Sequence, residues 1–479
     1  MRLTPATLDR LSPQVRQSRY EHQASAPTIV HFGVGAFHRA HQAVYTEDAN
    51  ETGESAWAIK GVSLRSAAVQ EQMEPQGCLY TVTEVSEAGH NTRLIRSIRQ
   101  LIVAPQDSAA VLAQLAHRDT QIVSFTITEK GYLTRTNGSL DFSSPDIASD
   151  LQRDSIPRSI FGFLGRALSH RRHAGYPGLT LLSCDNLTLN GAKLANLVDE
   201  YLERQDGTLA RWFRAECACP STMVDRIVPA TTKQRIATWE PIIGVRDEAM
   251  VVTEPFRQWI IEDRFAGPRP RWERGGAQFV SDVGPFETAK LRILNGAHSA
   301  LAYLGLERGH EFVHQAIADS RLLPLIKSLM YEEAASTLAP SLHQTLHLYA
   351  DAILKRFGNT ELPHRLDQIA IDGSQKIPQR WLGTLRIHQD AGQICPAILT
   401  GLASWIVFVK GEDRVVDDPL ASELAERWNR TGAEGIVNAL FGAQGPFANH
   451  WVASDREQMF LNALVVERLE HRKSNSRRA

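Results

Sequence analysis

The sequence predicts an α/β fold, in which a doubly wound, mostly parallel sheet is followed by a mostly α-helical C-terminal half. Strand and helix signals alternate up to about residue 285, and strand signals nearly vanish beyond it. The clearest unit begins with a β-rich stretch at 28–33 (TIVHFG), continues with apolar residues at helical spacing over 34–50, and ends with a second strand at 57–64. Strand, glycine turn, helix and strand form a βαβ unit, whose strands are parallel.

The elements after this unit keep the same alternation. Short strands are expected at 79–84, 93–98, 121–128 and 179–183, and helices at 106–116, 159–172 and 190–205. The tract 224–282 gives mixed signals and is assigned no elements. Further helices are expected at 289–305, 311–332, 341–357, 392–410 and 421–428. The change of pattern near Pro285 predicts two domains, residues 1–285 and 286–479.

Composition narrows the class of protein. The chain has 479 residues, 43% of them hydrophobic and 22% charged, with a net charge of −2. These values are typical of globular proteins, and without a field of one sign we expect no nucleic-acid partner. The five cysteines are scattered and odd in number, which favours a reducing compartment. No signal core and no apolar run near the roughly 20 residues of a membrane span is present. We expect a cytoplasmic monomer or small homo-oligomer without a membrane partner.

A glycine-rich turn follows the first strand of the βαβ unit. Gly33-Val34-Gly35-Ala36-Phe37-His38 matches the dinucleotide fingerprint GxGxxG, except that His38 replaces the third glycine. Glycines there permit a tight turn and close approach to a pyrophosphate, and the following helix directs N–H groups at it. A plain strand-to-helix turn is the alternative, and the motif alone leaves both open.

Two further patterns carry polar groups suited to alcohol oxidation. Lys290, Asn295 and His298 fall within roughly 140° of one another on a regular helix, so all three can face one cleft. Lysine can act as a base, asparagine can donate to an alkoxide, and histidine can orient a hydroxyl. A solvated lysine and a core histidine are the alternative. Asn186 ends the segment SCDN after a strand, where ligands bind in open sheets, although a simple Asx turn explains it equally well.

The pattern HExxH competes with this interpretation. His310, Glu311 and His314 match the zinc metalloprotease motif, in which two histidines bind the metal and the glutamate is the base. Gly309 directly precedes the pattern and places it at the start of a helix rather than inside one. A zinc hydrolase is therefore a remote alternative. So is a non-catalytic dinucleotide sensor, which would be expected to have lost the lysine–asparagine–histidine set.

Two long segments together resemble one family. IVHFGVGAFHRAHQAVYTED (29–48) and KLRILNGAHSALAYLG (290–305) are similar to the mannitol dehydrogenase family, the polyol-specific long-chain dehydrogenases. The similarity extends through TITEKGY (126–132), LLSCDNL (181–187) and DGSQKIPQR (372–380). It implies a Rossmann-type N-terminal domain, a helical C-terminal domain, and hydride transfer with NAD, or with NADP as a possible substitute, and no metal.

The resemblance also implies roles for single residues. It makes Lys290 the general base, Asn186 and Asn295 the pair that stabilises the alkoxide, and His298 the residue that positions the substrate. Glu287 assists proton release in this view. The expected substrate-pocket residues are Asp225 and Lys376, and the expected cofactor-binding residues are Gly33, Gly35, Ala36, Phe37 and Arg65.

Arg65 bears on cofactor choice, and three other cations bear on the substrate. The family's acidic NAD-binding position corresponds to alanine here, and Arg65 can tolerate a 2′-phosphate. TEKGY, FRQW and DGSQKxPQR are more similar to the group that acts on D-mannonate and D-fructuronate, whose carboxylate requires a cation. The candidate cations are Lys130, Arg257 and Arg292, with plain surface charges as the alternative. Mannitol and fructose are the second choice of substrate, ahead of other polyols.

Overall fold

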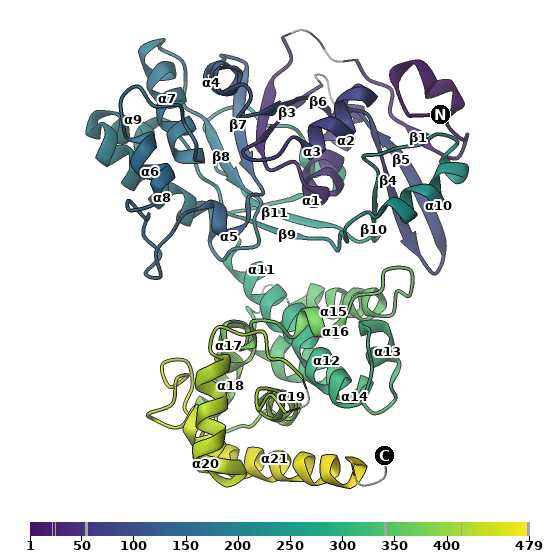
Figure 1. The fold of residues 1–479 in the computed structure, drawn as a ribbon, viewed down its shortest axis with the longest axis vertical. Coiled ribbons are helices and arrows are strands. Elements are labelled where there is room, and N and C mark those ends of the chain that lie inside the picture. Colours follow the sequence, from purple (N-terminus) through teal and green to yellow (C-terminus); the bar gives the residue numbers. More distant parts are fainter. Residues whose placement is uncertain (22, 24, 53–55, 340–342, 413, 477–479) are drawn as a thin grey trace. The chain divides into compact units, whose positions relative to one another are not determined.

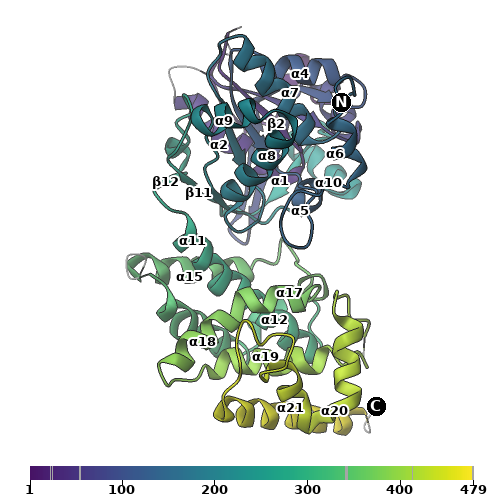
Figure 2. The ribbon, with the colours of Figure 1, turned by 90° about the vertical axis from the view of Figure 1, so that its left-hand side faces the viewer.

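The chain forms two units, Met1–Gly284 and Pro285–Ala479, in the computed structural model (Figures 1 and 2). The structure describes all residues except 22, 24, 53–55, 340–342, 413 and 477–479. Each unit has its own hydrophobic core, and each is described by itself.

A five-stranded parallel sheet forms the centre of the first unit. Its order is β6 (Ile98–Val103), β3 (Ala58–Ser63), β2 (Thr28–Phe32), β7 (Thr120–Phe125) and β8 (Thr180–Ser183). Counted along the chain within this sheet, the order is 3-2-1-4-5, the arrangement of doubly wound dinucleotide-binding sheets. The predicted parallel sheet is confirmed. The strand order reverses between β2 and β7, so the ligand crevice is expected beyond the carboxyl ends of these two strands.

Helices cover both faces of this sheet, as its continuous apolar strands require (Figure 1). Val30 and Phe32 pack on one face with α4 (Ser108–Ala116), α7 (Ile160–His173) and α8 (Asn190–Gln205). Ile29 packs on the other face in a cluster that includes Val44, Tyr45 and Trp272.

The helix expected after the glycine turn is in fact two helices, α1 (Ala36–Ala40) and α2 (Gln42–Thr52). His41 leaves the helical conformation, with φ −118° and ψ −93°, because its buried ring contacts the Gln258 carbonyl through Nε2 at 2.9 Å. The strand expected at 93–98 is also wrong in its bounds. Two strands, β5 (Gly89–Ile95) and β6, meet there and belong to different sheets.

Two smaller sheets complete the first unit. One has the order β1 (Arg16–Gln17), β5, β4 (Tyr80–Ser86), β10 (Val251–Thr253), and the other β12 (Gln278–Val280), β11 (Gln258–Glu262), β9 (Thr222–Asp225). Most of the second sheet comes from the tract 224–282, whose strands are too short to give a clear periodicity. The remaining helices are α3 (Ala68–Met73), α5 (Thr128–Gly131), α6 (Pro145–Asp150), α9 (Gly207–Glu216) and α10 (Lys233–Ile243).

The second unit is helical, as predicted, and is built around one buried helix. Residues 284–307 run without interruption through α11 (Gly284–Ala289), the π-helical turn η4 (Lys290–Asn295) and α12 (Gly296–Glu307). Every residue from Gly296 to Leu306 is buried, because α19 (Pro396–Phe408), α13 (Val313–Ala318) and α16 (Leu366–Ile369) pack around α12. The other helices are α14 (Leu323–Lys327), η5 (Ser328–Ala334), α15 (His343–Phe357), α17 (Gly373–Ile377), η8 (Pro378–Leu382), α18 (Gly383–Asp390), α20 (Ala421–Phe441) and α21 (Asp455–Ser476).

Several expected helix bounds in this unit are wrong. The single helix expected at 311–332 is broken into α13, α14 and η5, because Asp319 is extended and Pro324 is accommodated only in the first turn of a new helix. The helix expected at 421–428 continues to Phe441 across a kink at Gly432. Part of the helix expected at 341–357 lies outside the described residues. Among the residues that are described, no helix is both long and apolar enough to cross a membrane.

Candidate cofactor site and catalytic residues

The glycine turn lies where the carboxyl ends of β2 and β7 approach each other. Gly33 has a φ of +94°, and a Cβ at this position would lie 2.2 Å from the Thr126 carbonyl oxygen. Only glycine tolerates both conditions. A cavity of about 240 Å³ opens beside the turn and is lined by Gly33, Gly35, Ser63, Thr126 and neighbouring apolar side chains. The turn therefore provides backbone that a pyrophosphate can approach closely, and the residues present fit a dinucleotide.

A buried polar network supports this turn from below. His31 Nδ1 lies 2.8 Å from Ser124 Oγ, and His31 Nε2 lies 2.9 Å from Thr126 Oγ1 and 3.3 Å from the Gly33 carbonyl. Thr126 Oγ1 donates to that same carbonyl at 2.7 Å. Burial lowers the pKa of His31 to about 3, so the ring is neutral and carries one proton.

The partners of His31 identify the nitrogen that carries this proton. Ser124 Oγ donates to Gln42 Oε1 at 2.8 Å, so its oxygen accepts from His31, and we assign the proton to Nδ1. His31 Nε2 then carries the lone pair and faces the Thr126 hydroxyl at 2.9 Å. This chain of polar contacts from Gln42 to Thr126 supports the turn.

His38 takes the place of the third fingerprint glycine for a structural reason. Its ring stacks on His31 with centroids 3.4 Å apart and an interplanar angle of 15°. Burial and the neighbouring His31 hold the pKa of His38 well below its usual value, so two neutral rings are stacked in the interior. The departure from GxGxxG therefore contributes packing beneath the turn. Phe37 lies beside it in α1 with its ring 4.9 Å from His41.

Arg65 and the segment after β8 lie at the same carboxyl edge of the sheet. Arg65 is exposed directly after β3, in a turn closed by the Ser63 hydroxyl donating to the Ser66 carbonyl at 2.6 Å. Asp185 follows β8 and accepts from the Thr128 backbone N–H at 2.8 Å and from the Tyr132 hydroxyl at 2.8 Å. Burial raises the pKa of Asp185. Asp185, which the sequence motif did not single out, thus ties the segment TITEKGY to β8.

The other first-unit candidates differ in solvent exposure. Asn186 is exposed after Asp185, and Lys130 is exposed on α5. Asp225 is buried at the end of β9. Arg257 donates to Asp48 at 2.6 Å and lies with its guanidinium 4.6 Å from the centre of the Tyr45 ring.

In the second unit, the π-helical turn changes the geometry expected for Lys290 and Asn295. Hydrogen bonds in a π-turn run from residue i to i+5, and the Gly296 N–H accordingly donates to the Leu291 carbonyl. Residues five apart are thus successive neighbours along one face, whereas a regular helix would separate them by roughly 140°. Lys290, only 9% exposed, and Asn295 therefore share a face. π-turns within α-helices are frequent at functional sites.

Two polar atoms on this helix are buried without a partner among the described residues: Asn295 Oδ1 and His298 Nε2. The His298 ring packs against Phe357, with centroids 4.5 Å apart, and His364, at 5.4 Å. Burial, and then the charges of His364, Arg356 and Arg380, hold the pKa of His298 well below its usual value, so the ring is neutral. Unpartnered buried polar atoms are costly and point to a ligand.

The remaining second-unit candidates surround the same helix. Glu287 is buried on α11. Lys376 donates from Nζ to the carbonyls of Ile371 at 2.5 Å and Ile369 at 3.3 Å, and burial lowers its pKa. Arg292 donates to the Thr337 hydroxyl at 2.8 Å, so one of its nitrogens is engaged within the unit. Arg380, whose Nη1 donates to Ser299 at 2.7 Å, was missed by the sequence analysis. Its position one helical turn after Lys376 was the available signal.

The HExxH residues do not form a common site. His310 and Glu311 precede α13, which begins at Val313, so no helix brings His310 and His314 onto one face. His310 Nε2 lies 3.1 Å from Asp319, and Glu311 pairs with Arg365. Among the described residues, no three histidine, cysteine or carboxylate side chains are grouped so as to hold a metal ion.

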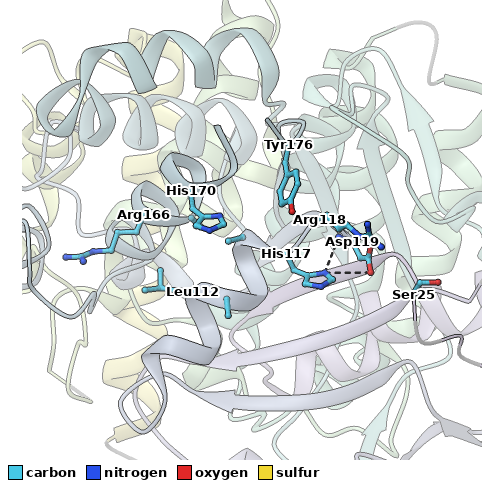
Figure 3. Close-up of a pocket in the computed structure, with 11 residues that line it drawn as sticks. Ser25, Leu112, His117, Arg118, Asp119, Arg166, His170 and Tyr176 are labelled. Carbon is cyan, nitrogen blue, oxygen red and sulfur yellow. Dashed lines mark hydrogen bonds and ion pairs between the residues drawn. The ribbon is translucent and has the colours of Figure 1, made fainter. Parts of the chain in front are cut away.

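A larger cavity of about 880 Å³ lies between α4 and α7 (Figure 3). Its polar lining includes His117 and Asp119, whose side chains lie 3.7 Å apart in the connection before β7. This connection meets the amino end of β7, whereas the glycine turn lies at the carboxyl ends. The cavity is therefore not the dinucleotide crevice.

A sheet of this order with a glycine turn at its reversal point defines a Rossmann-type dehydrogenase unit. Residues 27–274 match the model of the mannitol dehydrogenase Rossmann domain, and residues 282–449 match that of the mannitol dehydrogenase C-terminal domain. The chain therefore belongs to the mannitol dehydrogenase family, which confirms the resemblance. It is an oxidoreductase of the polyol and sugar-acid dehydrogenase type.

Relatives named for different activities are similarly close in sequence. D-mannonate oxidoreductase of Escherichia coli (strain K12) is 38% identical over 92% of this chain and 93% of its own. A mannitol 2-dehydrogenase of Phaeosphaeria nodorum is 36% identical over 92% of this chain and 81% of its own. The Pseudomonas fluorescens mannitol 2-dehydrogenase, solved as a ternary complex with NAD and D-mannitol, superposes with a TM-score of 0.81 at 32% identity, covering 99% of this chain and 100% of that one.

Gly33→Ala tests the steric limit at the turn. We expect a loss of about 2–3 kcal/mol in the free energy of unfolding and a weaker affinity for NADH, because the new Cβ meets the Thr126 carbonyl. The control is Gly138→Ala, where φ is +85° and nothing lies within 4 Å of a new Cβ. Urea unfolding and NADH fluorescence titration measure both effects. Equal losses in the two variants, with NADH affinity intact, would contradict the close contact.

His31→Gln tests whether the buried His31 beneath the glycine turn is neutral in the folded protein. The pKa values of His31 and His41 lie at about 3 in the folded protein, below the roughly 6.5 of an unfolded chain. Below pH 6.5 the unfolded state therefore binds more protons than the folded state. The stability that the neutral rings contribute is complete above pH 6.5 and is lost as the pH falls toward 3. We expect the free energy of unfolding to fall less steeply between pH 7 and 4 in His31→Gln than in wild type. The exposed His170→Gln is the control, and parallel slopes for wild type and His31→Gln would refute the assignment.

Proposed function

We propose that the protein is an NAD(P)-dependent oxidoreductase that interconverts D-mannonate and D-fructuronate, with Lys290 as general base and without a metal. The observation that carries the proposal is the intact set of Lys290 and Asn295 on the π-turn and His298 on α12, in which Asn295 Oδ1 and His298 Nε2 are buried without a partner among the described residues. The 38% identity to a D-mannonate oxidoreductase supports the sugar acid. Interconversion of mannitol and fructose is the second candidate, supported by the likeness to a mannitol 2-dehydrogenase solved with D-mannitol.

Each second-unit residue has a proposed task in oxidation of the secondary alcohol. A bound nicotinamide supplies the hydride acceptor. Lys290 accepts the hydroxyl proton at Nζ, and Glu287 assists its release. Asn295 turns its amide toward the oxygen and donates to the charge that develops there, which stabilises the transition state more than the ground state. Neutral His298 orients the hydroxyl through Nε2 and adds no further cation to the pocket.

The proposed tasks of the remaining residues are binding and positioning. Asn186 supplies the second amide donor to the alkoxide, and Asp225 and Lys376 contact substrate hydroxyls. The hydrogen bonds from Lys376 Nζ to two backbone carbonyls hold its ammonium group in one place, so its donor atom has a defined position. Gly33, Gly35 and the start of α1, including Ala36 and Phe37, hold the pyrophosphate of the cofactor.

We propose NAD as the cofactor, with NADP also accepted. The exposed Arg65 is suited to a 2′-phosphate, and no ion pair engages it among the described residues. We further propose a cytoplasmic protein that is a monomer or small homo-oligomer and acts on small molecules, without nucleic-acid or membrane partners. The net charge of −2 and the five free cysteines support this placement.

Lys290→Ala tests the general base. We expect kcat for D-mannonate oxidation to fall about 10²–10⁴-fold, the usual contribution of a general base. The exposed Lys327→Ala is the control. Absorbance at 340 nm with D-mannonate and D-mannitol side by side measures the rates, and we expect EDTA to leave them unchanged. Full activity in Lys290→Ala, or loss of activity with EDTA, would refute the mechanism, whereas turnover of D-mannitol alone would favour the second candidate.

Arg65→Ala tests cofactor choice. We expect kcat/KM for NADP to fall about tenfold or more, because a charge-assisted hydrogen bond to the 2′-phosphate is lost. The value for NAD should stay within about twofold, since NAD has no phosphate there. Arg99→Ala, which removes an exposed arginine on β6, is the control. An equal change in kcat/KM for both cofactors would show that Arg65 does not contact the 2′-phosphate.

A further inference from the structure

Arg380 is a partly buried guanidinium without a carboxylate partner in the described part of the chain. It lies on η8, and Nη1 donates to Ser299 Oγ at 2.7 Å and to the Asn295 carbonyl at 3.3 Å. Burial lowers the pKa of Arg380 to about 10, which leaves it charged at neutral pH. A buried charge that no opposite charge compensates is costly.

Other buried arginines show how this protein usually compensates such a charge. Arg226 pairs with Glu84 at 2.5 Å, and Arg93 pairs with Asp48 at 2.5 Å. Arg171 has no acidic partner among the described residues, but its Nε, Nη1 and Nη2 all donate to carbonyls, those of Pro177 and His117. Arg380 uses Nη1 alone. No described residue accepts from its Nε or Nη2, and neither atom is among the fully buried nitrogens without a partner, so both are accessible.

The accessible atoms form a defined edge of the guanidinium. Nε–H and Nη2–H point in nearly parallel directions and match the two oxygens of a carboxylate. Because Nη1 is bonded to the Asn295 carbonyl and to Ser299, this edge is held beside the residue proposed to stabilise the alkoxide. The charge of Arg380 also contributes to the low pKa values of His298 and Lys376, which places it close to both.

We propose that Arg380 binds the carboxylate of a sugar-acid substrate through its Nε and Nη2 edge, an inference that rests on the proposed function. The three cations expected from the sequence are less suited. Arg257 is paired with Asp48, Arg292 is engaged with Thr337, and Lys130 is exposed and presents a single point charge. Arg380 combines partial burial, a charge that no described carboxylate compensates, and an accessible bidentate edge.

The test compares an acid with its neutral counterpart. D-mannonate and D-mannitol differ at one end of the chain, where the acid has a carboxylate and the polyol a hydroxymethyl group. In Arg380→Gln we expect kcat/KM for D-mannonate to fall about 10²–10³-fold, mainly through KM, and that for D-mannitol to stay within about threefold. Arg380→Lys should lose about tenfold on D-mannonate, because the charge remains but the fork is lost. Arg386→Gln, which removes an exposed arginine from α18, should change neither.

The outcomes separate this inference from the proposed function. Wild-type turnover of D-mannonate with a selective loss in Arg380→Gln supports both. Equal loss on both substrates shows that Arg380 merely supports Asn295, and no loss shows that it is a bystander. Either result overturns the inference and leaves the proposed function standing. Turnover of D-mannitol alone overturns both.

A binding measurement covers the case in which neither compound is turned over. Thermal unfolding with NAD is then compared with and without D-mannonate, in wild type and in Arg380→Gln. Stabilisation of wild type alone would support the carboxylate site and refute D-mannonate as the substrate, and absence of stabilisation would overturn the site. Circular dichroism shows whether Arg380→Gln is folded. If it is not, the selectivity of Arg380→Lys for the two compounds decides the question.

Discussion

The close approach of Gly33 to the Thr126 carbonyl is the constraint on which the first unit depends. It occurs where the strand order reverses, and it requires a residue without a Cβ in the left-handed region. The network from Gln42 to His31 lies beneath it and must stay neutral, since burial strongly disfavours a charged imidazole. The stacked His38 completes this support, so the variant fingerprint and the rigid turn have one physical origin.

A comparable constraint organises the second unit. The helix that ends in α12 contains a π-turn, which places the side chains of Lys290 and Asn295 on one face. A regular helix would point these two side chains in different directions. The surrounding helices bury His298 and partly bury Arg380, so both side chains lie in a medium less polar than bulk water. Electrostatic interactions are stronger there than in water, and a single uncompensated cation can therefore discriminate between an acid and a polyol.

The way charges are compensated distinguishes structural from functional arginines in this protein. Arg93, Arg226 and Arg257 each have a carboxylate partner, and Arg171 is satisfied by carbonyls. Sequence alone cannot make this distinction, because the partners lie from six to more than two hundred positions away along the chain. Arg257 and Arg292 were therefore singled out as candidate cations by their motifs, whereas Arg380, at the end of the segment DGSQKIPQR, was not.

The sequence by itself determined the parallel sheet, the helical C-terminal half, and the family with its lysine, asparagine and histidine set. These depend on local patterns: runs of apolar residues, glycines at a turn, and fixed spacings along one helix. Tertiary structure alone decided that the helix after the turn breaks at His41, that tract 224–282 forms strands, and that residues 290–295 wind as a π-turn. It also decided that Arg380, among the described residues, has no carboxylate beside it. Each of these depends on contacts between residues distant in the chain, whose energies no local pattern records.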